Sequence, residues 1–342
     1  MRYGHHWVSI LVGILLGVPA CLVQASDVHA PKTYRIAMLL YRGETDAERG
    51  FRQYLQQKGL KVEYIVRDAA EDPKKLPAFV EEMRMLRPDL IYTFGTSATI
   101  ATVGKVAQKP STPVITDIPV VFNIVADPVG SGITQNLMGS ERNVTGVSHL
   151  VPIKSQLNAL RSATNGNRIA VIYSANEKNA VGSADALESA AKDDGFQVSR
   201  FPVGASDEAM ELKSLNAALD QVVAEKPDVL YMPSDSYLIK NAEVVGARMK
   251  YARIPTMSAT EAPIRKDGLV MGLVSPYFNA GAFAGRKAVQ ILIDQRAPGS
   301  LPISGLDRFS FLINMQTALD IGFYPKIRAL GFAEIIGLPK KR

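Results

Sequence analysis

The sequence has very few of the residues that form disulfides and metal centres. Among its 342 residues there are one cysteine, Cys21, and four histidines. A single cysteine excludes an intramolecular disulfide. Three of the histidines precede residue 30, so His149 is the one histidine of the expected folded body. We therefore expect neither a disulfide framework nor a transition-metal centre, because both need clusters of these residues.

Motifs of catalysis and of nucleotide binding are missing as well. The chain contains no GxGxxG, no Walker-type loop and no HExxH. A Ser-His-Asp triad would need His149, which falls in a segment expected to connect two lobes. Neither Glu177 nor Glu261 has a second carboxylate at a spacing that supports acid-base catalysis. We expect a protein that is not an enzyme and that holds no cofactor.

The charge balance does not indicate a nucleic-acid partner. The formal net charge is +6, and lysines and arginines form no runs interleaved with aromatic residues. With 47% hydrophobic and 21% charged residues, the composition is that of a folded globular protein rather than a disordered or fibrous chain. The length gives room for about two domains.

The N-terminal segment has the pattern of a secretory signal peptide. Arg2 is followed by an apolar run over residues 8–18 and then by small residues. This run is too short to predict a membrane span. We expect residues 1–25 to direct export, which predicts a periplasmic or otherwise extracytoplasmic protein.

Two processing routes remain open for this segment. Residues 23–25, Val-Gln-Ala, precede Ser26 and fit ordinary signal cleavage with soluble release. Residues 18–21, Val-Pro-Ala-Cys, resemble a lipobox, although proline is unusual there. On that second route Cys21 would be lipidated and would anchor the protein to a membrane surface.

Three segments of the chain occur twice, in the same order and about 135 residues apart. This period is far longer than the roughly 20–50 residues of solenoid repeats, so the repeated unit is a small domain. Two similar lobes enclose a cleft. The paired segments are 35–41 with 168–173, 58–62 with 194–198, and 87–92 with 226–231.

Short apolar runs alternate with segments of helical periodicity throughout the chain. This alternation predicts two Rossmann-like lobes, each with a parallel sheet flanked by helices. We expect lobe 1 over 34–145, completed by about 275–305, and lobe 2 over 146–274, completed by about 306–330, with crossings near 143–148 and 274–279. The expected strands are 35–41, 62–66, 90–94, 120–125, 169–173, 198–201, 229–232, 256–258 and 270–274. The expected helices are 47–58, 76–86, 98–109, 182–194, 211–225, 238–252 and 280–294.

The loops that follow the strands are the expected ligand sites of such sheets. Gly95-Thr96-Ser97 precedes a helix whose free N–H groups suit a carboxylate, although either hydroxyl also fits a helix cap. Asp235, in the corresponding loop of the other lobe, suits an ammonium group, with a helix cap as the alternative. One loop suits a carboxylate and the loop facing it suits an ammonium group, so together they predict a zwitterionic ligand.

Other candidate residues lie at the ends of neighbouring strands. Asp127 precedes Pro128 and fits either a ligand contact or a cap with proline at the first helical position. Tyr41, Tyr237 and Tyr277 stand where an aromatic side chain can pack on a ligand, or simply form part of the wall.

Several segments taken together resemble a known family. The chain resembles the periplasmic solute-binding proteins of ABC importers with the type I two-lobed fold, and more narrowly those associated with tryptophan and tyrosine uptake. The resemblance runs from about Tyr34 to Pro325. The segments that carry it are 95–98, 119–122, 126–130, 143–147, 172–177, 231–236 and 314–322.

This resemblance implies an exported receptor that closes on an amino-acid-like, possibly aromatic, ligand and delivers it to an ABC permease and its ATPase. The chain departs from the family in the loop 41–45, where Arg42 and Glu44 stand in place of a neutral wall, and at Pro276 in an expected crossing. We expect a monomer. The alternative is a sensor that reports ligand occupancy to a membrane signalling partner. The contacts implied by position are Thr96, Ser97, Asp127, Asn176, Ser234 and Asp235.

Overall fold

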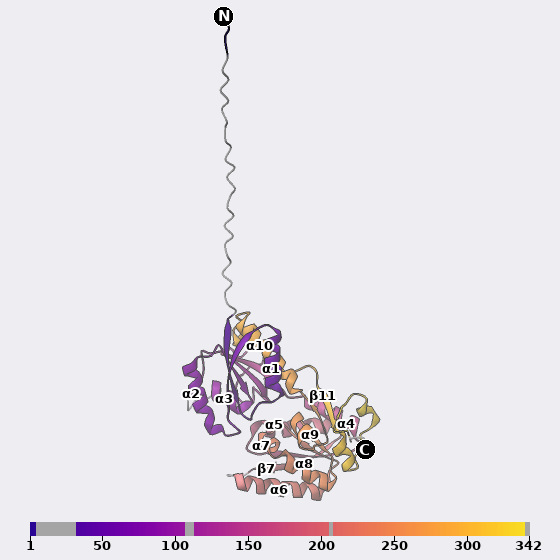
Figure 1. Cartoon of the computed structure of the whole chain (residues 1–342). Coiled ribbons are helices and arrows are strands. Elements are labelled where there is room, and N and C mark those ends of the chain that lie inside the picture. Colours follow the sequence, from indigo (N-terminus) through magenta and orange to yellow (C-terminus); the bar gives the residue numbers. More distant parts are fainter. Residues whose placement is uncertain (5–31, 107–112, 205–207, 339–342) are drawn as a thin grey trace. The chain divides into compact units, whose positions relative to one another are not determined.

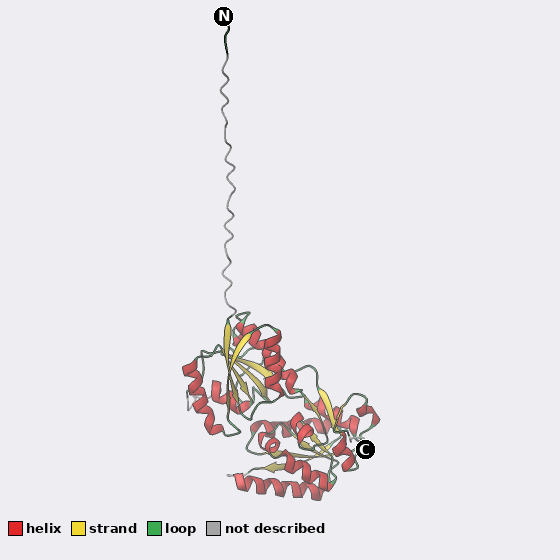
Figure 2. Ribbon diagram, viewed as in Figure 1, coloured by secondary structure: helices red, strands yellow, loops and turns green. Residues whose placement is uncertain are grey.

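The computed structural model describes residues 1–4, 32–106, 113–204 and 208–338. The chain divides into two units, Met1–Lys32 and Thr33–Arg342. Within the first unit, the described residues 1–4 and 32 form no helix or strand. Cys21 and both expected processing sites lie outside the described residues. The second unit is built of helices packed on two sheets (Figures 1 and 2).

The first sheet is parallel throughout, with strand order β2-β1-β3-β4-β5. Its side chains alternate between two helical layers, as the pleat of a strand requires. Ile36 and Met38 of β1 pack with α1 and α10, whereas Ala37 and Leu39 pack with α2 and α3. The elements of this lobe are β1 (Thr33–Leu40), α1 (Asp46–Gln57), β2 (Lys61–Asp68), η1 (Pro73–Lys75), α2 (Leu76–Leu86), β3 (Leu90–Phe94), α3 (Thr96–Val103), β4 (Val120–Val125), β5 (Val144–Ser148), α10 (Tyr277–Leu292) and η2 (Pro298–Ser300).

The second sheet has the order β12-β11-β10-β9-β8-β6-β7. Helices α4, α5, α11 and α12 pack on one face and α6, α7, α8 and α9 on the other. The elements are α4 (Ile153–Ala163), β6 (Arg168–Ser174), α5 (Lys178–Asp193), β7 (Gln197–Val203), α6 (Glu208–Glu225), β8 (Val229–Met232), α7 (Ser236–Lys240), α8 (Ala242–Ala252), β9 (Thr256–Ser258), α9 (Glu261–Lys266), β10 (Met271–Val274), β11 (Ser310–Asn314), α11 (Met315–Asp320), α12 (Ile327–Leu330) and β12 (Glu334–Ile336).

Helix α10 comes from the last quarter of the chain but belongs to the first lobe. It packs so closely on α1 that glycine is required at the contact. A Cβ atom on Gly281 would lie 1.8 Å from the carbonyl oxygen of Ala47, and one on Gly50 would lie 2.0 Å from that of Phe278. The chain therefore passes between the lobes after β5, after β10 and after η2.

All nine strands expected from the sequence are present, each within two residues of its predicted bounds. Three predictions need correction. The expected helix 238–252 is two helices that meet at Asn241, and the helix expected over 98–109 ends at Val103 because Gly104 takes a positive φ of 69°. The second sheet is not wholly parallel, since β11 pairs with β10 in the antiparallel sense.

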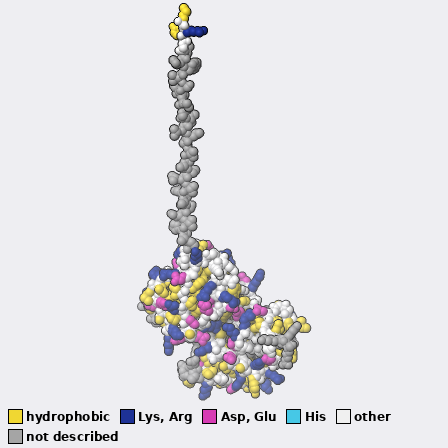
Figure 3. All heavy atoms as spheres, in the orientation of Figure 1, with side chains coloured by type: hydrophobic (Ala, Val, Ile, Leu, Met, Phe, Trp, Pro, Cys, Tyr) yellow, Lys and Arg dark blue, Asp and Glu magenta, His cyan; other side chains and the backbone are white. Residues whose placement is uncertain are grey.

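No helix in the described ranges is both long enough and apolar enough to cross a membrane. On the face shown in Figure 3, basic and acidic side chains are interspersed over the described surface.

Candidate functional site

A cleft opens where loops at the carboxyl ends of strands from both sheets face each other. Its wide part has a volume of ≈ 560 Å³. A narrow part of ≈ 40 Å³ continues from it and shares Thr96, Ser97 and Glu177 with the wide part. Ligands of parallel α/β sheets bind at this end of the strands. The predicted residues on the wide part are Tyr41, Thr96, Ser97, Asn176 and Tyr237.

Helix α3 presents its N-terminus to the cleft without a side-chain cap. Its N-cap residue is Gly95, with φ of 86°, and no side chain accepts a hydrogen bond there. The alternative in which Thr96 or Ser97 caps this helix therefore does not hold, because both residues lie inside its first turn. Backbone N–H groups at an uncapped helix start attract anions.

Asp235 is not on the wall of the cleft, contrary to the role first assigned to it. Its side chain is fully buried and caps α7, where Oδ1 accepts from the Leu238 amide at 2.9 Å. Oδ2 accepts from the Ser174 amide at 2.6 Å, and Oδ1 also accepts from the Ser174 hydroxyl at 2.9 Å. Burial raises the pKa of Asp235. The structure thus favours the cap alternative: this carboxylate ties the loop after β8 to the end of β6.

Glu177 lines the cleft in both its wide and narrow parts, whereas Glu71 and Glu211 line the wide part only. The sequence analysis gave it no ligand role. Its Oε2 accepts from the Ser236 amide at 2.8 Å, and its Oε1 accepts from the Ser236 hydroxyl at 3.1 Å and from Asn179 Nδ2 at 3.0 Å. Burial, and after it the negative charge of Asp235, raises the pKa of Glu177. A cation bound in the cleft would stabilise the charged form of the Glu177 carboxylate.

Asp127 also lies away from the cleft. It lines a different cavity, of ≈ 430 Å³, together with Gln156 and Tyr231. Its Oδ1 accepts from the Gly130 amide at 2.8 Å, which is the geometry of a turn cap. Pro128 begins a turn rather than the expected helix. The prediction of Asp127 as a cleft residue is therefore corrected.

Aromatic residues form the narrow part of the cleft. Tyr277, which is 3% exposed, meets Phe94 edge-on with ring centroids 6.2 Å apart and His149 at 6.3 Å. The Tyr277 hydroxyl accepts from Arg42 Nη2 at 3.1 Å. The hydroxyl of Tyr41 donates to the carbonyl oxygen of Glu71 at 3.1 Å, so this ring is held at the cleft wall.

Ser234 lies in the narrow part, where its hydroxyl is 3.0 Å from Nε2 of the buried His149. Burial, and next the charge of Arg42, lowers the pKa of His149 to about 4, so the imidazole is neutral near pH 7. Its Nδ1 is buried without a hydrogen-bond partner among the described residues. Polar groups thus line this narrow space from both lobes.

A buried chain of hydrogen bonds supports the cleft from the first lobe. Glu48 accepts from the Thr45 amide at 2.7 Å and from the Tyr92 hydroxyl at 2.7 Å. Asn123 Nδ2 donates to the same hydroxyl at 3.1 Å, and Asn123 Oδ1 accepts from the Ile124 amide. Ile124, on the cleft wall, has φ of 54°, which is strained for a β-branched residue. The network holds this strained turn and the loop after β1 in place.

A comparison of the sequence with known families covers nearly the whole of this fold. The profile of the family described as ABC transporter substrate binding protein matches residues 37–327. The chain belongs to this family. Membership in a family of substrate-binding proteins agrees with the expectation of a binding protein rather than an enzyme.

Individual members and solved structures extend the comparison. A tyrosine-binding protein of Clostridioides difficile (strain R20291) is 27% identical over 304 residues, which cover 86% of this chain and 83% of the relative. A protein of Streptococcus pneumonia solved in complex with L-Trp has a TM-score of 0.77 at 20% identity, covering 89% of this chain and 99% of that one. A conserved domain protein of Vibrio cholerae also has a TM-score of 0.77, at 23% identity with the same coverage.

The cleft contains groups that can bind a ligand. In the described part of the chain, no group of three or more His, Cys, Asp or Glu side chains is placed to hold a metal ion. The cleft instead combines an uncapped helix start, a partly buried acid and aromatic rings. Sequence reasoning missed Glu177 because only the folded loops distinguish an acid on the cleft wall from one in a cap.

Proposed function

We propose that this chain is the extracytoplasmic receptor of an ABC importer and that it binds an amino acid, with an aromatic side chain, in its cleft. Family membership supports the transport role. The relative named for tyrosine and the solved complex with L-Trp support the ligand class. On this proposal residues 1–25 direct export and the chain works as a monomer with a permease and an ATPase.

The observation that carries the proposal is the chemistry of the two opposite cleft walls. The uncapped start of α3, at Thr96 and Ser97, offers backbone N–H groups suited to a carboxylate. Glu177 on the other wall offers a carboxylate suited to an ammonium group. A free amino acid presents both charges at once. A sugar or nucleoside has no ammonium group to offer Glu177.

Glu177 therefore takes the role that the sequence analysis assigned to Asp235. The carboxylate of Asp235 is fully enclosed, whereas that of Glu177 reaches the cavity surface. Asn176 and Ser234 remain proposed polar contacts from the second lobe, with the Ser234 hydroxyl shared with His149.

Three tyrosines complete the proposed ligand contacts. Tyr41 and Tyr237 line the wide part of the cleft and Tyr277 lines the narrow part. Aromatic rings pack well on one another in offset or edge-on arrangements, with a gain of about 0.5–1.5 kcal/mol per pair beyond area burial. This surface favours an aromatic over an aliphatic side chain.

Titration calorimetry of the purified protein tests the proposal. We expect L-Tyr or L-Trp to bind, and Glu177→Gln to weaken binding by more than about tenfold, because an ammonium group would lose its charged partner. Glu243→Gln, an exposed acid on α8, is the matched control and should bind like the wild type. Unchanged affinity in Glu177→Gln would contradict the proposed pose.

A further inference from the structure

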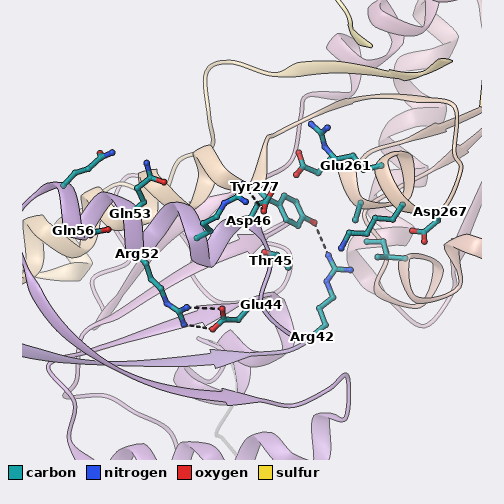
Figure 4. Close-up of a pocket in the computed structure, with 16 residues that line it drawn as sticks. Arg42, Glu44, Thr45, Asp46, Arg52, Gln53, Gln56, Glu261, Asp267 and Tyr277 are labelled. Atoms are coloured by element: carbon teal, nitrogen blue, oxygen red, sulfur yellow. Dashed lines mark hydrogen bonds and ion pairs between the residues drawn. The ribbon is translucent and has the colours of Figure 1, made fainter. Parts of the chain in front are cut away.

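The cleft contains a cation that the proposed contacts with the amino and carboxyl groups do not use. Arg42 follows β1 and lines both the narrow part of the cleft and a larger cavity of ≈ 980 Å³ beyond it. Its Nη2 donates to the Tyr277 hydroxyl at 3.1 Å, and its Cζ lies 5.6 Å from the centroid of the Phe94 ring. Figure 4 shows the Arg42 side chain reaching Tyr277 at the larger cavity.

Arg42 differs from the other arginines around the same cavity in its partners. Arg52 pairs with Glu44 and Arg49 with Asp46, both within the first lobe (Figure 4 shows the first pair). Among the described residues, Arg42 has no carboxylate partner within ion-pair distance. A guanidinium carries several N–H donors and no acceptor, so one tyrosine hydroxyl leaves most of its capacity unused.

The side chains that Arg42 contacts supply no anion. Phe94 offers only its ring face, and Tyr277 is a neutral hydroxyl that already accepts one hydrogen bond from Arg42. His149 is neutral near pH 7 and has Nε2 directed to Ser234. Glu177 lines the narrow part and Glu261 the larger cavity, but among the described residues neither forms an ion pair with Arg42. The guanidinium is therefore available to an acceptor on a ligand.

The order of residues along the cleft says which part of a ligand reaches Arg42. Thr96, Ser97 and Glu177, proposed to hold the two α-substituents, are shared by the wide and narrow parts. Arg42 and Tyr277 are shared by the narrow part and the cavity beyond it. A side chain that leads from the α-carbon toward the narrow part would meet these two residues once that part, now ≈ 40 Å³, widens to admit a ring.

We propose that Arg42 recognises an oxygen acceptor at the far end of the ligand side chain, and so selects amino acids such as tyrosine over their oxygen-free counterparts. The inference rests on the proposed function, since it assumes an amino acid in this cleft. A site built to hydrogen-bond a substrate group rejects the analogue that lacks it, because the donor is then buried unpaired. An anionic oxygen would bind more strongly than a neutral phenol, because charge-assisted hydrogen bonds are stronger.

A ligand series and two arginine variants test this inference by titration calorimetry. The ligands are L-Phe, L-Tyr and L-4-carboxyphenylalanine, which carry no oxygen, a phenol and a carboxylate at the same ring position. We expect the wild type to prefer both oxygen-bearing ligands over L-Phe by more than about tenfold. Arg42→Met should reduce these ratios to near one while L-Phe affinity changes little, and Arg42→Lys should keep part of the preference.

Arg49→Met is the matched control, because Arg49 lines the larger cavity but not the cleft. It should keep the wild-type ratios. Equal loss of affinity for all three ligands in Arg42→Met would overturn the inference, because it would assign Arg42 to the α-carboxylate. A wild-type ratio near one would overturn it as well. Failure of every aromatic amino acid to bind the wild type would refute the proposed function itself, and the inference with it.

Discussion

Replacing Asp235 by alanine should destabilise the protein far more than it weakens ligand binding. In the structure this carboxylate accepts from the backbone amides of Ser174 and Leu238 and from the Ser174 hydroxyl. Alanine leaves two buried N–H groups without a partner, and each such group costs about 1–3 kcal/mol. Removing the carboxylate also removes the cost of burying its charge, which offsets part of this loss. The raised pKa of Asp235 reflects that cost.

The net expectation is a loss of about 2–4 kcal/mol in the free energy of unfolding. For a chain of this size that corresponds to a fall of roughly 3–6 °C in the melting temperature of the ligand-free protein. The assay is thermal unfolding followed by circular dichroism, with ligand affinity measured on the folded variant at low temperature. Affinity should change by less than about threefold, because the carboxylate does not reach the cleft.

Asp127→Ala is the matched control for this variant. It removes a carboxylate that accepts from the amide of the exposed Gly130, which water can replace. The expected loss is below about 1 kcal/mol. The reasoning is refuted if the free energy of unfolding of Asp235→Ala lies within about 1 kcal/mol of the wild-type value while its ligand affinity falls more than tenfold. Asp235 would then be a ligand contact after all.

Two further predictions concern the lobe that carries α10. Gly281→Ala should lower the free energy of unfolding by more than about 2 kcal/mol in urea, because the added Cβ would meet the Ala47 carbonyl oxygen. Gly182→Ala on α5 is the control: its Cβ would meet no other atom, so the variant should be slightly stabilised. Equal effects of the two substitutions would contradict the packing of α10 on α1. Burial lowers the pKa of Lys287 to about 8 from 10.5, so above about pH 8 the unfolded chain holds more protons and stability rises with pH up to about 10.5. The stability difference between wild type and Lys287→Met should therefore change over this range, and a constant difference would exclude the shift.

The strands of both lobes could be predicted because they are apolar runs bounded by turn residues. Segments 90–94, 120–125, 229–232 and 256–258 agree with the structure at both ends. Segment 143–148 was predicted as a crossing between the lobes, and it is the strand β5, Val144–Ser148, after which the chain leaves the first sheet. A Cβ on its Gly146 would lie 2.3 Å from the Phe122 ring, a tertiary contact that local periodicity does not reveal. The later strands β11 and β12 were not among the expected strands.

The site could be predicted as a set of loops but not as a set of contacts. Thr96 and Ser97 lie on the cleft as expected, since they directly follow a buried strand. The choice between Asp235 and Glu177 depends on Ser174 and Ser236, each about 60 residues away in the chain from the acid that it bonds. Arg42 was visible in the sequence as a departure from its family, but its position beside Tyr277 required the fold.

Fluorescence titration with L-Trp tests the central claim, an aromatic amino acid in the cleft, most directly. Trp7 is the only tryptophan of the chain and lies in the segment expected to be removed on export, so the processed protein emits only from tyrosine. We predict a saturable fall in tyrosine emission as bound indole accepts energy from Tyr41 and Tyr277 beside the cleft, reversed by excess L-Tyr but not by a sugar. A linear, unsaturable response, together with thermal stabilisation by a sugar or nucleoside and by no amino acid, would contradict the account.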